Sequence, residues 1–123
     1  MNLLLDTHVF LWWIDNRAVP ADAREAIEAA DRIYVSLVSA WEVSIKVAVG
    51  KLRPVRAFES TISESGFEKL PITFAHAEQV ASLPTHHGDP FDRMLIVQAM
   101  AENLTVVTHD RRFEAYGVPI LWA

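Results

Sequence analysis

Residues 104–110, LTVVTHD, form an apolar strand that runs directly into an aspartate, Asp110. The N-terminus repeats this arrangement, since residues 2–5 (NLLL) form a strand that ends at Asp6. Two strands that end in carboxylates predict a sheet with an acidic edge. The residues between them indicate how the two strands are connected.

Strand-like and helical stretches alternate along the whole chain. Further strands are predicted at residues 33–36 (IYVS), 67–72 (FEKLPI) and 118–121 (VPIL). Helices are predicted at residues 7–16, 20–31, 39–49, 55–65, 74–83 and 91–103. Pro71 places the FEKLPI strand at an edge of the sheet.

Strands that alternate with helices form right-handed βαβ units and a parallel sheet covered on both faces. The sequence therefore predicts an α/β fold, a doubly wound parallel sheet of four to five strands flanked by helices. Its 123 residues fit a single domain, residues 1–123. In such sheets the functional residues lie beyond the carboxyl ends of the strands, at a topological switch point.

The composition excludes several classes of protein. Hydrophobic residues make up 51% of the chain, which is enough for a sizeable core. The absence of cysteine excludes disulfide scaffolds and thiolate zinc sites, and it suits a cytoplasmic protein. No apolar run reaches the roughly 18 residues of a membrane span, so no membrane association is expected. The net charge of −5 counts mildly against a nucleic-acid-binding surface, although bound cations would offset a clustered acidic site.

Four carboxylates are expected to meet at the carboxyl edge of the sheet. Asp6 and Asp110 end strands, while Asp92 opens the helix that leads into residues 104–110. Glu42 lies in the first turns of the helix after residues 33–36. If the first and fourth strands are adjacent, all four acids reach one edge, where they repel one another strongly without a cation. Hard oxygen ligands at this density suit Mg²⁺ or Mn²⁺ rather than zinc.

Each acid also has a purely structural interpretation. Asp6 and Asp110 are suited to cap the helices that follow them, and neither residue alone distinguishes capping from metal binding. Asp89, followed by proline, is best explained as a helix N-cap, whereas Asp92 is interpreted as a ligand that also benefits from the helix dipole. Glu42 lies four residues before Lys46 in a helix that is apolar nearly all round. This helix is therefore predicted to be buried, and a buried Glu42 needs a lysine, a metal or both as partner.

The order of these motifs resembles the PIN domain, specifically the VapC-like toxins of bacterial type II toxin–antitoxin systems. The resemblance covers essentially the whole chain. It rests on the stretches LLLDTHVFLWW with Asp6, VSAWEVSIKVAVGKL with Glu42, HHGDPFDRMLIVQA with Asp92 and VVTHDRRF with Asp110. Spacing to the Thr-x-Asp motif favours Asp92 over Asp89 as the metal ligand.

The resemblance implies adjacent first and fourth strands and a metal-dependent endoribonuclease that hydrolyses RNA phosphodiester bonds with an activated water. It implies Mg²⁺ as the cofactor, with Mn²⁺ able to substitute. The catalytic and metal-binding residues would be Asp6, Glu42, Asp92 and Asp110. Supporting or substrate-binding roles fall to Thr7, Lys46, Asp89, Arg93 and Thr108, and Arg93 is placed to meet a phosphate. The implied partners are RNA, a cognate antitoxin and a second copy of the chain in a homodimer.

The remaining conspicuous residues receive more modest interpretations. His86 and His87 lie in a polar loop and are interpreted as loop residues without a specific role (loop decoration). Arg111 and Arg112 are interpreted as solvated surface charge. The chain is also rich in tryptophan, and core packing accounts for one or two of Trp12, Trp13 and Trp41. An apolar groove for the antitoxin, or a dimer interface, is expected to use the rest.

Two rival functions remain open at this point. A phosphate-handling regulatory domain also places aspartate after its first strand, but a phosphatase needs a second aspartate where His8 stands. Both a receiver and a phosphatase also need a lysine late in the chain, and none follows Lys69. A non-catalytic interaction module would use the acids only as caps and would lack a Mg²⁺ or Mn²⁺ site.

Overall fold

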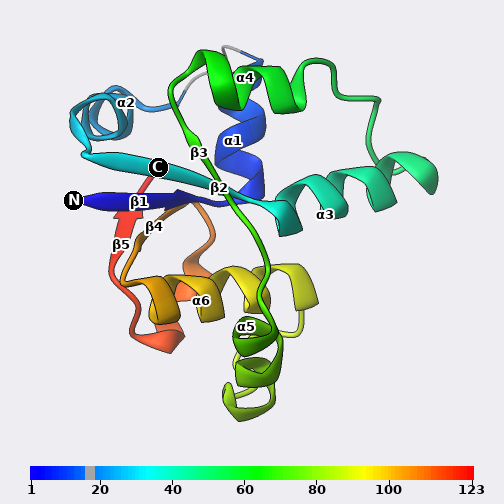
Figure 1. Ribbon diagram of the computed structural model, residues 1–123, viewed down its shortest axis with the longest axis vertical. Coiled ribbons are helices and arrows are strands. Elements are labelled where there is room, and N and C mark those ends of the chain that lie inside the picture. The colour runs from blue at the N-terminus through cyan, green and yellow to red at the C-terminus, as the bar shows by residue number, and fades with distance from the viewer. Residues whose placement is uncertain (16–18) are drawn as a thin grey trace.

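The computed structural model describes residues 1–15 and 19–123, which form a layered α/β structure (Figure 1). The described strands are β1 (Asn2–Leu5), β2 (Arg32–Ser36), β3 (Glu68–Leu70), β4 (Thr105–Thr108) and β5 (Ile120–Trp122). The described α-helices are α1 (Thr7–Ile14), α2 (Ala21–Ala29), α3 (Leu37–Ala48), α4 (Phe58–Glu64), α5 (Phe74–Gln79) and α6 (Pro90–Glu102). Two 3₁₀ helices, η1 (Val80–Ser82) and η2 (Arg111–Tyr116), complete the list. None of the helices in these described ranges is long and apolar enough to cross a membrane.

The sheet is parallel throughout, with the strand order β3-β2-β1-β4-β5. The chain starts at the centre of the sheet, moves outward to β3, and then returns to the other side of β1 for β4 and β5. This order is doubly wound, and its switch point lies between the carboxyl ends of β1 and β4. The predicted adjacency of the first and fourth strands is confirmed, as is the edge position of the strand that precedes Pro71.

Helices cover both faces of the sheet. Side chains alternate between the two faces along each strand, so each strand contributes to both layers of the core. Leu4 packs on the face that α6 covers, while Leu3 and Leu5 pack on the opposite face, among residues of α1, α2 and α4. Figure 1 shows these two helical layers on either side of the strands. All three leucines are fully buried, and each such burial contributes roughly 1.5–3 kcal/mol. β1 is thereby fixed at the centre, and the position of the next residue, Asp6, is fixed with it.

Most predicted elements are present, but their ends move by a few residues for local reasons. The helix predicted from residue 39 begins at Leu37, because the side chain of Ser36 accepts from the backbone N–H of Val38 at 3.0 Å and caps it. The helix predicted over residues 74–83 divides into α5 and η1, and the strand predicted over residues 67–72 shortens to β3. The end predicted at residue 16 for the first helix lies outside the described residues.

The helix predicted to be apolar nearly all round and buried is only partly buried as α3. α3 extends away from the carboxyl end of β2 and covers neither face of the sheet (Figure 1). One face of α3 is buried and carries Val38, Ser39, Glu42 and Val43. Leu37, Trp41, Ile45 and Val49 are exposed. They are spaced four residues apart and so form one apolar stripe along the helix.

Candidate metal centre

Asp6 is buried where β1 ends beside β4. Its backbone N–H donates to the carbonyl of Val107 at 3.0 Å, which continues the sheet by one residue. Side-chain Oδ1 accepts from the backbone N–H of Val9 at 2.8 Å and caps α1, while Oδ2 accepts from the hydroxyl of Thr108. Burial raises the pKa of this carboxyl, and these two hydrogen bonds oppose the rise only in part. Asp6 is therefore a helix cap and a member of the acidic site at the same time.

Glu42 brings the second carboxylate from α3 and is only 2% exposed. Its Oε1 accepts from the hydroxyl of Thr7 at 2.7 Å, and its Oε2 accepts from Nζ of Lys46 at 2.6 Å. The hydroxyl of Thr7 also lies 2.9 Å from Oγ of Ser39. The hydrogen bond to Glu42 raises the pKa of the Lys46 ammonium. Glu42 is thus buried and paired with Lys46, as the spacing predicts.

Asp92 lies in the first turn of α6 and brings the third carboxylate. Burial raises the pKa of Asp92 to about 6, and the negative charges of Asp89, Glu42 and Asp6 add to the rise. A hydrogen bond from His87 opposes it. Asp92 is therefore within electrostatic range of both Asp6 and Glu42, as expected for carboxylates that share one site.

Asp110 follows β4 and brings the fourth carboxylate. Its Oδ1 accepts from the backbone N–H of Arg112 at 3.0 Å and caps η2. The guanidinium of Arg112 also binds both oxygens, with Nη2 2.7 Å from Oδ2 and Nε 3.0 Å from Oδ1. These bonds hold the pKa of Asp110 below its usual value. The interpretation of Arg112 as solvated charge is incomplete, because this exposed arginine is the counter-ion of a candidate ligand.

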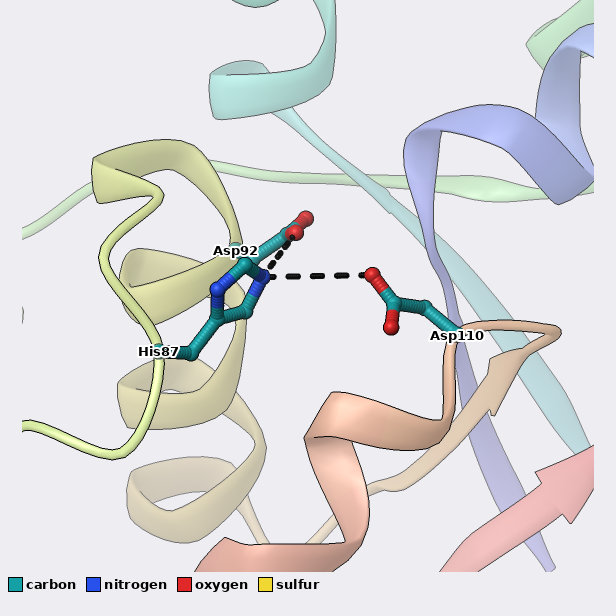
Figure 2. A group of neighbouring side chains, drawn as sticks. All are labelled: His87, Asp92 and Asp110. Carbon is teal, nitrogen blue, oxygen red and sulfur yellow. Dashed lines mark hydrogen bonds and ion pairs between the residues drawn. The ribbon is translucent and has the colours of Figure 1, made fainter.

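His87 lies between Asp92 and Asp110 and joins them (Figure 2). Its Nε2 is 2.8 Å from Oδ2 of Asp92 and 3.9 Å from Oδ2 of Asp110. One potential ligand atom from each of the three residues lies within 4.8 Å of the others. The interpretation of His87 as loop decoration is wrong, since the residue is 5% exposed. The signal that could have revealed it is its position five residues before Asp92, across the turn that starts α6.

Asp89 and Arg93 organise the start of α6. Oδ1 of Asp89 accepts from the backbone N–H groups of Phe91 at 2.8 Å and Asp92 at 3.2 Å, so its predicted role as N-cap is confirmed. The guanidinium of Arg93 donates to loop carbonyls, including that of Pro84 at 2.9 Å. This geometry ties the loop to α6 and does not favour the phosphate contact expected from the position of Arg93 beside Asp92.

The donor set fits a hard divalent cation. Four carboxylates come from four elements of the fold, and the pKa values of two of them, Asp6 and Asp92, are raised by burial. The carboxylates also repel one another, and a bound cation relieves this repulsion. Carboxylate oxygens are the ligands that Mg²⁺ and Mn²⁺ prefer.

The fold and the site together define the class of this protein: a doubly wound parallel α/β protein with an acidic centre at its switch point. A family model described as the PIN domain matches residues 3–119, and the chain belongs to the PIN-domain family. Among characterised proteins it is similar to ribonuclease VapC22 of Mycobacterium tuberculosis. The two are 30% identical over 123 residues, which is 96% of this chain and 94% of the relative.

Solved structures share the fold. VapBC2 of Rickettsia felis, bound to a promoter DNA fragment, aligns with a TM-score of 0.74 and 19% identity over 99% of this chain and 98% of the other. DNA-bound VapBC of Salmonella typhimurium aligns with a TM-score of 0.73 and 22% identity over the same shares of the two chains. VapBC-5 of Mycobacterium tuberculosis, from the VapBC family of toxin–antitoxin systems, gives 0.63 and 24% identity over 98% of this chain and 96% of the other.

Proposed function

We propose that this protein is an endoribonuclease that acts as the toxin of a toxin–antitoxin pair. The observation that carries the proposal is a set of carboxylates at the switch point of a PIN fold: Asp92 lies within electrostatic range of Asp6 and Glu42, and His87 contacts both Asp92 and Asp110. Its support from relatives is the similarity to a ribonuclease over nearly the whole length of both chains. The substrate is RNA, and the reaction is hydrolysis of its phosphodiester bonds.

The proposed catalytic and metal-binding residues are Asp6, Glu42, Asp92 and Asp110. They would hold a divalent cation, Mg²⁺ with Mn²⁺ able to substitute. When bound, the cation supplies Lewis acidity, which lowers the pKa of a water molecule and neutralises charge on the phosphate. The residues of the chain orient these carboxylates. Thr108 holds Asp6, and Thr7 and Lys46 hold the two oxygens of Glu42.

The proposed antitoxin partner is supported by an apolar groove of about 910 Å³, whose lining includes none of the four proposed ligands. Its lining comes from α3, α4, the ends of β2 and β3 and residues 54–55, and it includes Ala40, Val43, Val47, Phe58 and Leu70. An apolar groove suits a partner segment that folds along it, and several solved structures with this fold belong to toxin–antitoxin systems. We propose that the groove receives the antitoxin.

The test is cleavage of a structured RNA pool by the purified chain in Mn²⁺ or in EDTA, beside Asp6→Asn. Asp22→Asn is the matched control, because Asp22 is an exposed acid in the first turn of α2. Cleavage is expected in Mn²⁺ with the native chain and the control, and is expected to be lost in EDTA and in Asp6→Asn. Full activity of Asp6→Asn would contradict the assignment. Absence of both cleavage and Mn²⁺ binding would favour an interaction module instead.

A further inference from the structure

His87 is buried at the acidic centre, and the proposed reaction gives it no role. It stands in the loop between η1 and α6, yet it contacts carboxylates from two elements, Asp92 on α6 and Asp110 after β4 (Figure 2). Its imidazole also packs edge-on against Phe113, with ring centroids 6.4 Å apart. A histidine held on several sides in this way keeps one orientation.

The neighbours of the ring favour one tautomer. Nδ1 of His87 faces the backbone N–H of Asp89 at 3.5 Å, the outer limit of a hydrogen bond. The tautomer with its hydrogen on Nε2 satisfies this contact and donates to Oδ2 of Asp92, which lies 2.8 Å from Nε2. A histidine that binds a metal through Nε2 has the opposite arrangement, because its Nδ1–H is donated to an acceptor. In the tautomer that these contacts favour, the ring holds the Asp92 carboxylate and does not ligate a cation.

The loop that carries His87 is itself held in place by Tyr116 and Arg93. The hydroxyl of Tyr116 accepts from the backbone N–H of His87 at 2.8 Å and from that of His86 at 3.1 Å. The guanidinium of Arg93 donates to the same hydroxyl at 3.2 Å and to the carbonyl of Leu83 at 3.2 Å. Because Tyr116 lies at the end of η2, which starts after Asp110, these contacts connect the loop to both acids.

We propose that His87 is a positioning residue of the metal centre, which fixes the Asp92 carboxylate through Oδ2 so that its other oxygen is held for the cation. Tyr116 and Arg93 act through His87 by fixing its backbone. This inference rests on the proposed metal-dependent function. Outer partners that orient a metal ligand affect metal affinity without touching the metal, and their loss weakens binding by roughly 10–100-fold.

The test measures the Kd for Mn²⁺ of the full chain, by calorimetry, in three variants. His87→Leu removes the donor, and His87→Gln keeps an N–H donor at about the reach of Nε2. Thr85→Val is the matched control, because Thr85 is an exposed residue of the same loop. The expected result is binding weakened roughly 10–100-fold in His87→Leu, mostly restored in His87→Gln and unchanged in Thr85→Val.

A second measurement separates positioning from direct ligation. Mn²⁺ bound to protein with ¹⁵N-labelled histidine is studied by pulsed electron paramagnetic resonance. The expected spectrum has no directly coordinated histidine nitrogen, and it reads the site even if His87→Leu folds poorly.

The outcomes are distinguishable. A directly bound histidine nitrogen, or native affinity in His87→Leu, would overturn the positioning role alone. Equal losses in His87→Leu and His87→Gln, in folded protein, would also overturn it, since the donor would then not matter. Absence of Mn²⁺ binding by the native chain would overturn the metal-dependent function together with this inference.

Discussion

The hydroxyl of Thr108, the last residue of β4, donates a hydrogen bond to Oδ2 of Asp6, the residue that follows β1. The strand pairing produces this contact, because β1 and β4 run in parallel register up to the pair Leu5 and Val107. The next residue on each strand is then Asp6 on one side and Thr108 on the other. Oγ1 of Thr108 also accepts from the backbone N–H of Asp110 at 3.0 Å. One hydroxyl therefore connects two of the proposed metal ligands.

Replacing Thr108 by valine is expected to weaken Mn²⁺ binding by roughly 10-fold. The change keeps the shape of the side chain but removes the hydrogen bond that opposes the raised pKa of Asp6. Asp6 then holds its proton more tightly, and the proton competes with the cation. Calorimetric titration with Mn²⁺ at neutral pH measures the effect. Thr105→Val, on the same strand but away from the carboxylates, is expected to bind as the native chain does, and an equal loss in both variants would contradict the explanation.

Without a cation, the free energy of unfolding is expected to fall as the pH rises from about 4 to about 7. Burial raises the pKa of Asp92 from 3.8 to about 6, so in this range the native state binds more protons than the unfolded chain. The raised pKa of Asp6 acts in the same direction. The Asp92 shift alone corresponds to about 3 kcal/mol. Thermal unfolding in EDTA at several pH values measures the slope.

Two additions make this pH prediction specific. Mn²⁺ is expected to raise the unfolding temperature most near pH 7, where the carboxylates are ionised and the cation offsets their repulsion. Asp92→Asn removes one titrating group and is expected to flatten the slope. A metal-free protein whose stability rises through this range would show that the pKa values of Asp92 and Asp6 are not raised in the native state as described.

Lys46→Met is expected to destabilise the metal-free protein by roughly 1–3 kcal/mol, because it leaves the buried charge of Glu42 without its partner. Since a bound cation also compensates Glu42, the stabilisation by Mn²⁺ is expected to be larger in this variant than in the native chain. Urea unfolding with and without Mn²⁺ gives both numbers. Lys51→Met is the control, because Lys51 is an exposed lysine beyond the end of α3. Identical Mn²⁺ stabilisation in the native chain and Lys46→Met would separate Glu42 from the cation.

The sheet order and the electrostatic proximity of Asp92 to Asp6 and Glu42 were predictable because both depend on patterns that the sequence displays directly. Apolar runs that end in Asp6 and Asp110 identify the ends of two strands, and the alternation with helices makes the sheet parallel. The capping and metal-binding interpretations of an aspartate do not exclude each other. Asp6, Asp89 and Asp110 each cap a helix, and all three lie near the candidate metal centre. A carboxylate has two oxygens and serves both purposes.

The contacts of His87, Arg93 and Arg112 were not predictable in the same way. The contacts of His87 and Arg93 depend on how the loop before α6 folds back, and loop geometry has no periodic signature in the sequence. The contact of Arg112 with Asp110 is local and depends on the turn that starts η2. The burial of His87 arises from the position of Tyr116, which is 29 residues away along the chain. The exposed stripe on α3 was missed for a similar reason, because an apolar helix is buried only where another layer covers it, and α3 extends beyond the sheet.

This stripe predicts how the chain self-associates. Trp41, Ile45 and Val49 lie on one side of α3, whereas Ala40, Val43 and Val47 line the groove on another side. Leu37, at the start of the stripe, also lines the groove. If the stripe forms the proposed homodimer interface and the groove receives the antitoxin, the two sets of variants behave differently. Trp41 is 56% exposed, and large exposed aromatic residues are typical anchors of interfaces. Trp41→Glu is expected to weaken dimerisation by roughly 30-fold, which corresponds to about 2 kcal/mol. Sedimentation velocity over a range of concentrations measures this change.

Val49→Glu, at the far end of the same stripe, tests the stripe without disturbing the contact between Trp41 and Phe91. It is expected to weaken the dimer as well, while Val47→Glu in the groove is expected to leave the dimer intact. The reverse pattern, with Val47→Glu dissociating the dimer and the stripe variants silent, would place the second copy in the groove. The antitoxin and the second copy would then compete for one surface, and binding of the antitoxin would require the dimer to separate. The expected pattern, in which only the stripe variants weaken the dimer, would let a dimer of the chain hold two antitoxin segments at once.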